Sequence, residues 1–252
     1  MTTAGGAVKI VAIVQARMDS TRLPGKVLMD LGGETVLARV VRRLRRTAKV
    51  NEIVVATTHS IADDAIVQEC QRLNVPSFRG SENDVLDRYY HAARVRAAGV
   101  VVRITSDCPV IDPDLVDETI RVFQEQHGDY ASNSFPRTYP RGLDTEVFTM
   151  AALEQAWRNA HKSYEREHVT PYFYEHPELF QLVALRGRTD YSRYRWTLDT
   201  AEDLELLRAM YTRFGSLDDF SWGEGIQLME REPELAELNS HVAQKSLHEA
   251  RC

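Results

Sequence analysis

The sequence "VKIVAIVQARMDSTRLPGKVL", residues 8–28, joins two segments of opposite character. The first, "VKIVAIVQA" (8–16), is an almost continuous apolar run, which predicts a strand buried on both faces. The second is a short loop that carries three cations, Arg17, Arg22 and Lys26, among hydroxyl, proline and glycine residues. A buried strand that ends in such a loop predicts a site for a small anionic ligand at the carboxyl end of the strand.

Short apolar runs and amphipathic segments alternate along the first half of the chain. The predicted strands are 8–16, 52–58, 75–78 and 100–105, and the predicted helices between and after them are 35–46, 63–73, 83–99 and 112–123. This alternation is typical of βαβ units, so we expect an α/β fold with a mostly parallel sheet. After residue 125 the pattern loosens into candidate strands at 129–134, 142–149 and 180–187 and a helix at 201–214, and we expect antiparallel strands there.

Composition narrows the class of ligand and partner. The chain has 252 residues and a net charge of −6, which argues against a nucleic-acid or membrane-surface partner, because both need a basic surface. The three cysteines (Cys70, Cys108, Cys252) lie far apart, a pattern typical of a reducing compartment. With no secretory signal and no apolar run near the roughly 18 residues that span a bilayer, we expect a cytoplasmic protein.

The cationic loop does not match the two common phosphate-binding fingerprints. Neither a GxGxxG nor a GxxxxGK[ST] sequence follows the first strand, which argues against a dinucleotide-binding dehydrogenase and a P-loop NTPase. A solvated basic loop without a ligand is the alternative interpretation, because charged side chains are mostly exposed.

Six strings in a fixed order resemble the sugar-acid cytidylyltransferases, in the branch of the spore-coat polysaccharide biosynthesis protein SpsF. They are "QARMDSTRLPGKVL" (15–28), "GSENDVLDRYYHAA" (80–93), "RITSDCPVIDP" (103–113), "PRGLDTEVF" (140–148), "EREHVTPYFY" (165–174) and "RWTLDTAEDLELL" (195–207). The resemblance implies a three-layer α/β/α, Rossmann-like fold of the nucleotide-diphospho-sugar transferase (GT-A-like) type. It also implies transfer of CMP from CTP to a sugar acid, with release of pyrophosphate, for polysaccharide biosynthesis.

The resemblance also implies roles for the loop and the organisation of the chain. Arg17 and Lys26 would hold the triphosphate of CTP, with Arg22 a weaker candidate, and Gln15, Ala16 and Gly25 would complete the nucleotide-binding loop. We expect cytosine to lie against Arg79, Gly80 and Ser81, although a plain turn before the next helix explains these residues equally well. We expect one domain over 1–238, with a nucleotide-binding half (1–125) and an acceptor-binding and oligomerisation half (126–238), a polar tail over 239–252, and a homodimer.

Asp107 and Asp199 are the candidate metal ligands. Each follows a predicted strand directly, and two strand ends of one sheet can lie side by side. Mg²⁺ prefers one or two carboxylates together with phosphate oxygens and water, and the resemblance assigns the metal ligands to the same positions. The alternative roles are a helix cap for Asp199, which Thr200 could share, and a turn residue for Asp107.

The acceptor would be an acidic sugar or a phosphorylated small molecule, because arginines gather in the second half of the chain. The candidates for binding it are Thr105, Arg141, Asp144, Glu146 and Arg195, with Asp144 and Glu146 expected to alternate on one strand. Thr105 stands where many family members carry a glutamine that holds the acceptor, so the usual ketosugar acids are not implied. Glu165, Glu167 and His168 suggest either a chemical role, as an acid–base or zinc cluster, or a structural role in helix capping and pairing between helices.

Two other functions remain open from the sequence. A GT-A glycosyltransferase would use a finished nucleotide sugar, but no DxD motif follows an apolar strand, and Arg17 with Lys26 suits a triphosphate better. A non-catalytic nucleotide-binding partner would not need Arg17, Lys26, Asp107 and Asp199 together.

Overall fold

The computed structural model describes residues 8–244, and its centre is a seven-stranded sheet in the order β3-β2-β1-β4-β6-β5-β7. The strands are β1 (Ile10–Gln15), β2 (Glu52–Thr58), β3 (Ser77–Gly80), β4 (Val100–Thr105), β5 (Tyr130–Ser132), β6 (Glu146–Thr149) and β7 (Leu182–Ala184). Pairing is parallel throughout except on both sides of β6, which runs antiparallel to β4 and β5. The predicted α/β class with a mostly parallel mixed sheet is confirmed.

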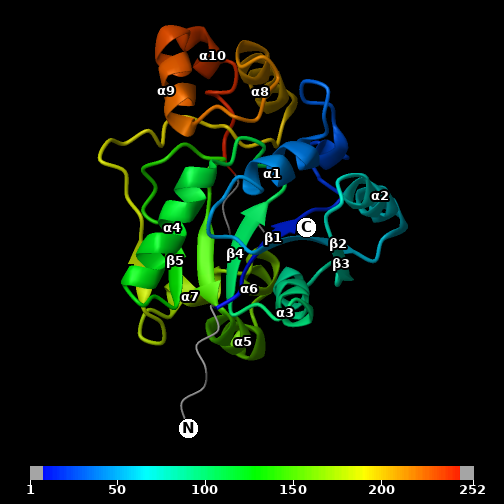
Figure 1. Ribbon diagram of the computed structural model, residues 1–252, viewed down its shortest axis with the longest axis vertical. Coiled ribbons are helices and arrows are strands. Elements are labelled where there is room, and N and C mark those ends of the chain that lie inside the picture. Colours follow the sequence, from blue (N-terminus) through cyan, green and yellow to red (C-terminus); the bar gives the residue numbers. More distant parts are fainter. Residues whose placement is uncertain (1–7, 245–252) are drawn as a thin grey trace.

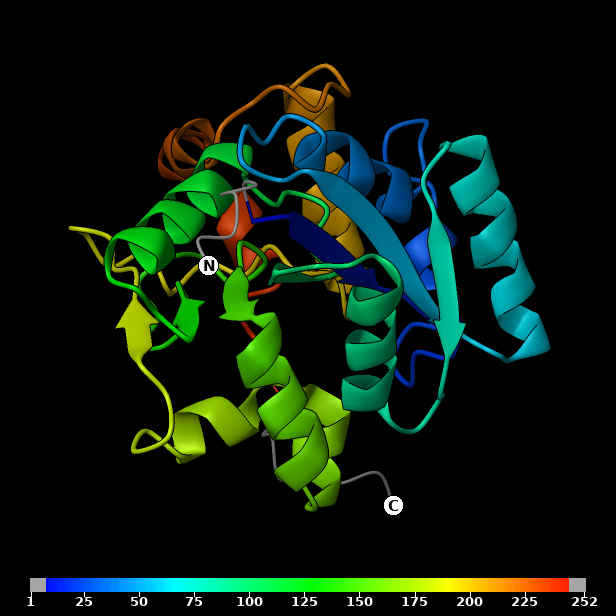
Figure 2. The same cartoon turned by 60° about the horizontal axis from the view of Figure 1, so that its bottom comes forward.

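Helices cover both faces of this sheet (Figures 1 and 2). One apolar core lies under α1 (Val36–Leu44), α2 (Asp64–Arg72), α4 (Pro113–Glu125), α8 (Ala201–Arg213), α9 (Trp222–Arg231) and α10 (Pro233–Glu237). The other lies under α3 (Val85–Val95), α5 (Met150–Asn159), α6 (Ser163–His168) and α7 (Pro171–Glu175). This is the predicted three-layer arrangement. Short 3-10 helices η1 (Lys26–Leu28) and η2 (Ile61–Asp63) complete the elements.

Side-chain alternation along the central strands decides which residues reach which core. Ile13 and Val11 on β1 pack with α3, whereas Ala12 and Val14 pack on the opposite face with α1. The same alternation places Arg103 on the α3 face of β4. Tyr89 of α3 is fully buried and donates its hydroxyl to the carbonyls of Ile13 and Ile104, at 3.1 and 3.3 Å, which fixes α3 beneath the central strands.

The second half of the chain differs from its prediction in two ways. Only β6 is antiparallel, since β5 and β7 run parallel to the central strands. The strand predicted over 142–149 begins at Glu146, so Asp144 precedes it and does not alternate with Glu146 on a strand. Asn133 explains the late start: its side chain bonds the carbonyl of Leu143 and the amide of Thr145, at 2.7 and 2.9 Å, in place of a strand partner.

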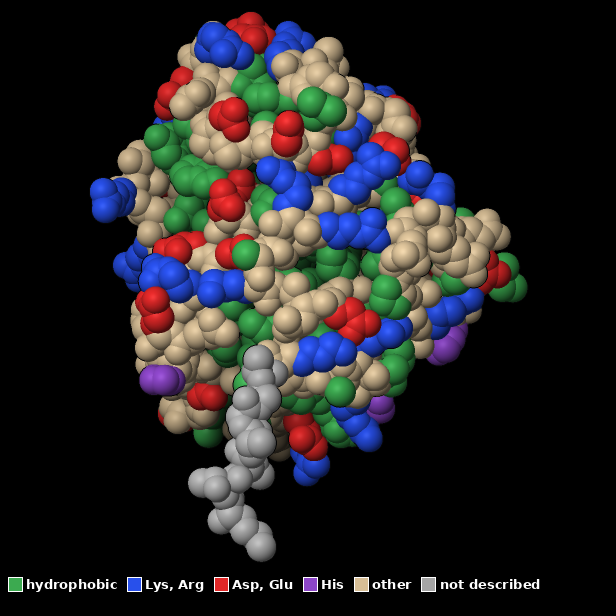
Figure 3. Space-filling model, viewed as in Figure 1, with side chains coloured by type: hydrophobic (Ala, Val, Ile, Leu, Met, Phe, Trp, Pro, Cys, Tyr) green, Lys and Arg blue, Asp and Glu red, His purple; other side chains and the backbone are tan. Residues whose placement is uncertain are grey.

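The surface carries charges of both signs. Figure 3 shows Lys and Arg interspersed with Asp and Glu on the face viewed, as expected for a chain of net charge −6. None of the helices in the described part of the chain has the length and apolarity that crossing a membrane requires.

The C-terminal segment starts packing before it leaves the described residues. Asn239, in the expected polar tail, is 2% exposed and donates its amide to the carbonyl of Arg195 and to Asp203, at 2.9 and 2.8 Å. Asn239 therefore packs against the body, whereas Ser240, His241, Ala243 and Gln244 are exposed, and the domain boundary expected at 238 stays a prediction. The rest of the expected tail, 245–252, lies outside the described residues.

Candidate active site

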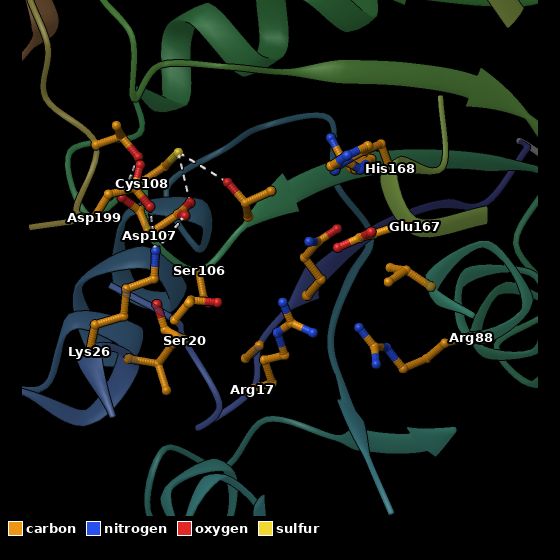
Figure 4. A pocket seen from close by; sticks show the side chains of 18 of the residues that line it. Arg17, Ser20, Lys26, Arg88, Ser106, Asp107, Cys108, Glu167, His168 and Asp199 are labelled. Carbon is orange, nitrogen blue, oxygen red and sulfur yellow. Dashed lines mark hydrogen bonds and ion pairs between the residues drawn. The ribbon is translucent and has the colours of Figure 1, made fainter. Parts of the chain in front are cut away.

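A cavity of about 800 Å³ opens at the carboxyl ends of β1 and β4 (Figure 4). Its walls come from segments far apart in the sequence: the loop after β1, residues 82–88, the end of β4, α6, the segment before α8, and Gln244. The carboxyl end of a parallel sheet is where such folds bind ligands, because connecting loops converge there without closing over the strands.

Lys26, Asp107 and Asp199 form the centre of one end of this cavity. The Lys26 ammonium donates to Asp107 Oδ2 at 2.8 Å, to Asp199 Oδ1 at 2.9 Å and to the carbonyl of Leu198 at 2.6 Å. Lys26 is only 8% exposed. Figure 4 shows the ammonium pointing at the two carboxylates, which come from the ends of different segments. The two aspartates therefore lie side by side, as predicted, but only Asp107 follows a strand: the segment before Asp199 is an irregular connection with a single bridge from Arg195 to Arg141, and not the predicted strand.

The charges in this cluster stabilise one another. Burial lowers the pKa of the Lys26 ammonium, but the adjacent Asp107 and Asp199 carboxylates outweigh it, so the pKa is raised. Burial raises the pKa of Asp199, but Lys26, Arg22 and Arg195 outweigh it and lower that pKa to about 2. Arg22 and Arg195 both contact Asp199 Oδ2, at 2.8 and 2.7 Å. Lys26 and Asp199 are therefore both charged at neutral pH.

Local structure holds the two carboxylates in place. The Leu198 amide donates to the carbonyl of Asp107 at 2.8 Å, which fastens the end of β4 to the segment before α8. Thr200 is the N-cap of α8 and Asp203 completes its capping box, so Asp199 does not serve as the cap. Its carboxylate is therefore left to face the cavity.

The cationic loop is anchored at both ends. Gly25 has φ of 71°, a left-handed conformation that favours glycine, and its amide donates to the carbonyl of Met18 at 2.9 Å. The amide of Met18 donates to Asp63 Oδ1 at 2.7 Å, and Asp63 is itself bonded by Thr57 and Thr58. A loop fixed in this way presents Arg17 and Lys26 at defined positions.

The other cations of the cavity fall into two groups. Arg103 pairs with Glu146, and Arg166 pairs with Asp84, so these two guanidiniums are neutralised within the protein. Arg17, Arg88 and Arg141 have no carboxylate within 4.0 Å among residues 8–244. The second group is therefore available to a negatively charged ligand.

Arg88 is the most buried of these unpaired guanidiniums, at 2% exposure. Its Nη1 donates to the carbonyl of Ser81 at 2.8 Å, whereas its buried Nε has no hydrogen-bond partner. Burial lowers its pKa, which reflects the free-energy cost of an uncompensated charge. In Figure 4 the guanidinium points into the cavity from the side opposite Lys26, toward Arg17. Gln15 also lines the cavity, and its buried Oε1 has no partner either.

The structure brings together most of the residues predicted for this site. The predicted residues that line the cavity are Gln15, Ala16, Arg17, Arg22, Lys26, Thr105, Asp107, Arg141, Asp144 and Asp199. Gly25 and Arg195 lie just behind this lining, the first shaping the loop and the second contacting Asp199. Glu146 does not line it either, because Arg103 and the Tyr130 hydroxyl hold its carboxylate in the interior.

The residues predicted for cytosine, Arg79, Gly80 and Ser81, are not part of the cavity lining. Arg79 turns toward the connection after β2, where it pairs with Asp64 and donates to the carbonyls of Thr58 and Ser60, at 2.7 and 2.6 Å. The lining starts one residue later and comprises Glu82, Asn83, Asp84 and Val85. The cavity lining therefore begins directly after the predicted segment, and contact of Arg79, Gly80 and Ser81 with cytosine stays a prediction.

The acidic and histidine residues of α6 play different roles. Glu165 is 2% exposed and accepts from the amides of His161 and Lys162, at 3.1 and 3.0 Å, as a helix cap. Glu167 and His168 line the cavity. Across residues 8–244, no group of three or more histidine, cysteine or acidic side chains is arranged to hold a metal ion. Capping, one of the two predicted roles, therefore applies to Glu165.

The sequence did not single out several residues of the lining, chiefly Arg88, Arg103 and Gln244. Arg88 lies within an amphipathic helix and Arg103 within an apolar strand, where a charged residue suggests only an exposed position. Gln244 accepts a hydrogen bond from Arg195 at 2.7 Å, across 49 residues of sequence. No local pattern could have predicted that contact.

Comparison with known proteins decides the family. A family model described as "Cytidylyltransferase" matches residues 11–245. The chain belongs to the cytidylyltransferase family. It is therefore a CTP-dependent nucleotidyltransferase, and the predicted family and activity are confirmed.

Individual cytidylyltransferases support this assignment. The chain is 37% identical over 234 residues to the spore coat polysaccharide biosynthesis protein SpsF of Bacillus subtilis, covering 90% of this chain and 96% of SpsF. A solved cytidylyltransferase from Leptospira borgpetersenii serovar Hardjo-bovis has a TM-score of 0.88 and 34% identity, covering 95% of this chain and all of that chain. A 3-deoxy-manno-octulosonate cytidylyltransferase of Geobacter sulfurreducens is 37% identical over 120 residues, which is 46% of each chain.

Proposed function

We propose that this cytidylyltransferase transfers CMP from CTP to a hydroxyl group of an acidic sugar, for cell-envelope, capsular or spore-coat polysaccharide. In this reaction the hydroxyl oxygen bonds to the α-phosphorus, the bond from that phosphorus to the β-phosphate bridge breaks, and pyrophosphate leaves with the electron pair. The hydroxyl proton passes to solvent or to a cavity base. The names of two relatives, SpsF and the 3-deoxy-manno-octulosonate enzyme, support this class of acceptor.

The charge distribution in the cavity carries the proposal. Three guanidiniums that have no carboxylate partner within residues 8–244, those of Arg17, Arg88 and Arg141, line one cavity. Arg88 is buried and the other two are half-buried, and because an unpaired buried cation is costly, a ligand that neutralises it gains binding free energy. Arg17 extends from the phosphate-binding loop and suits the triphosphate. Arg88 lies on the opposite side and suits a second anion, the acid group of the acceptor (Figure 4).

We propose Mg²⁺ as the cofactor, held by Asp107 and Asp199. The Asp107 and Asp199 carboxylates lie on either side of the Lys26 nitrogen, and in residues 8–244 no third histidine, cysteine or acidic side chain is arranged with them to hold a metal. Two carboxylates suit an ion that completes its shell with phosphate oxygens and water. When bound, the ion would neutralise charge on the phosphates during the displacement. The chain's own part is to orient the triphosphate with Arg17 and to stabilise the departing pyrophosphate with Lys26.

The acceptor residues follow from the same arrangement. Thr105, Arg141 and Asp144 line the cavity beside Asp107 and are proposed to contact the acceptor, together with Arg88. Arg195 is proposed to act through Asp199, since it contacts that carboxylate and not the cavity. The homodimer, the cytoplasmic location and the division into two functional halves remain predictions.

Nucleotide selectivity tests the proposal without knowledge of the acceptor. Thermal unfolding is followed with Mg²⁺ and each of CTP, UTP, ATP and GTP. A ligand at about 100 times its dissociation constant stabilises the folded state by roughly 2.7 kcal/mol, which raises the melting temperature visibly. We expect CTP to raise it most and Arg17→Met to remove the effect. Pyrophosphate release with a panel of sugar acids then identifies the acceptor. Stabilisation by UDP- or GDP-sugars without stabilisation by CTP would instead support the glycosyltransferase.

A further inference from the structure

Lys26 has no donor left for a phosphate group in this structure. An ammonium group has three N–H donors, and those of Lys26 point to three protein oxygens: Asp107 Oδ2, Asp199 Oδ1 and the carbonyl of Leu198. All three distances are 2.9 Å or less. The side chain proposed to meet the departing pyrophosphate is thus fully occupied by the carboxylates proposed to hold the metal.

The charges of this cluster already balance. Lys26 and Arg22 carry two positive charges against the two negative charges of Asp107 and Asp199. Arg195, which also contacts Asp199, is balanced by the buried Asp203. A divalent cation that entered alone would therefore meet a neutral cluster and the repulsion of a buried ammonium. CTP changes this balance, because its triphosphate brings negative charge for both the metal and Lys26.

We infer that the Lys26 ammonium occupies the metal position as long as no nucleotide is bound, and that it moves from the two carboxylates to the triphosphate when Mg²⁺ enters with CTP. This inference rests on the proposed function. It gives Lys26 two states: in the nucleotide-free protein it holds Asp107 and Asp199 together, and in the complex it contacts phosphate oxygens. Metal binding and nucleotide binding then occur together.

The loop allows such an exchange without a large rearrangement. Lys26 lies at the start of η1, on a four-carbon side chain with several rotatable bonds, in a loop whose backbone is fixed through Met18 and Asp63. Rotation of the side chain alone can move the ammonium from the carboxylates to the cavity, where Arg17 lies (Figure 4). The energetic cost of leaving the carboxylates is offset by the metal that replaces the ammonium.

Mn²⁺ is the probe that tests the exchange, because its paramagnetic resonance signal counts free ion directly. We expect the nucleotide-free wild type to bind Mn²⁺ at least tenfold more weakly than Lys26→Met, in which the competing charge is gone and the length of the side chain is kept. Lys9→Met is the matched control. Lys9 lies at the opposite end of β1, paired with Glu52 at 2.8 Å, so its loss changes the net charge equally but not the site. With CTP present, the wild-type protein should bind Mn²⁺ more tightly than CTP binds it in the absence of protein.

A nucleotide-free wild type that binds Mn²⁺ as tightly as Lys26→Met would overturn the inference. If Lys26→Met folds poorly because Asp107 and Asp199 then repel each other, Mn²⁺ should raise its melting temperature and leave that of the wild type unchanged. Equal shifts would contradict the exchange. Asp107→Asn separates this inference from the proposed function: if it leaves Mn²⁺ binding with CTP intact, the proposed metal site is wrong. If it weakens that binding while wild type and Lys26→Met bind Mn²⁺ equally without CTP, only the exchange is wrong.

Discussion

Gly142 is the position where the smallest substitution should disturb the site most. Its φ is 107°, which L side chains rarely adopt, and a Cβ there would lie 2.5 Å from the carbonyl carbon of Trp196 and 2.7 Å from the amide nitrogen of Thr197. Ordinary contacts between nonbonded carbon atoms are 3.5–4.0 Å, so about 1 Å of backbone movement would be needed. Backbone cannot move aside as a flexible side chain can.

The cost of Gly142→Ala follows from two contributions. The left-handed conformation costs an alanine roughly 1–2 kcal/mol. Separating the two segments also weakens two backbone hydrogen bonds, from Arg141 to Tyr194 at 3.0 Å and from Trp196 to Arg141 at 2.6 Å, each of which contributes about 1 kcal/mol. We therefore expect Gly142→Ala to lower the free energy of unfolding by about 3–4 kcal/mol. Because Trp196 and Thr197 lead directly to Asp199, pyrophosphate release should fall as well.

Gly215→Ala is the matched control for this substitution. Gly215 also has positive φ, 64°, but a Cβ there would meet nothing within 4 Å. Gly215→Ala should therefore lower the free energy of unfolding only by the conformational contribution, about 1 kcal/mol, and the variant should keep its activity. Urea unfolding at pH 7 measures both losses, and pyrophosphate release is assayed well below each melting temperature. Equal destabilisation by the two substitutions would refute the reasoning, because the contact with Trp196 and Thr197 would then be without consequence.

Three further outcomes are expected. The pKa of Asp199 is lowered to about 2, so the ionised carboxylate stabilises the fold at pH values above the ordinary carboxyl pKa. As the pH falls from 4 to 2, this contribution to the free energy of unfolding, about 2 kcal/mol, should be lost. Asp199→Asn should not show this loss in acid unfolding. Arg43→Met leaves the buried carbonyls of Ile111 and Phe220 without this donor, whereas Arg46 still donates to that of Asp218. It should lower the free energy of unfolding in urea by about 3 kcal/mol while the melting shift with CTP persists. Arg88→Met should raise the KM of the acid found in the acceptor screen at least tenfold and leave the KM of CTP within twofold; a change confined to CTP would place Arg88 with the base.

The central strands could be predicted from sequence because their burial is continuous. The strands at 52–58 and 100–105 were predicted with the bounds that the structure has. The short strands in the second half were harder to predict, because side chains such as that of Asn133 there form hydrogen bonds that a neighbouring strand would otherwise form. The third strand is shifted two residues from its prediction, because Val75 and Pro76 precede the pairing with β2.

Buried arginines show what periodicity cannot predict. The apolar face predicted for α1 is present, yet Arg39 and Arg43 on the same helix are also buried, at 1% and 0% exposure. Arg43 reaches the carbonyls of Ile111, Asp218 and Phe220, and Arg39 lies 4.4 Å above the Tyr211 ring. Sequence patterns rank arginine as exposed, and these partners come from segments far along the chain, Ile111 before α4, Tyr211 on α8 and residues 216–220, which only the tertiary fold brings to α1.

The same limit applies to the site, and it explains why an acidic chain can bind anions. The sequence shows how many charges there are but not which of them pair. Arg103 is neutralised by Glu146 across two strands, whereas Arg88 keeps an unpaired charge in the cavity wall, and no local pattern distinguishes them. Ligand preference follows from the cations that folding leaves without a carboxylate. Among residues 8–244, three guanidiniums without a carboxylate partner, those of Arg17, Arg88 and Arg141, line one cavity, and the net charge of −6 of the chain leaves them unneutralised there.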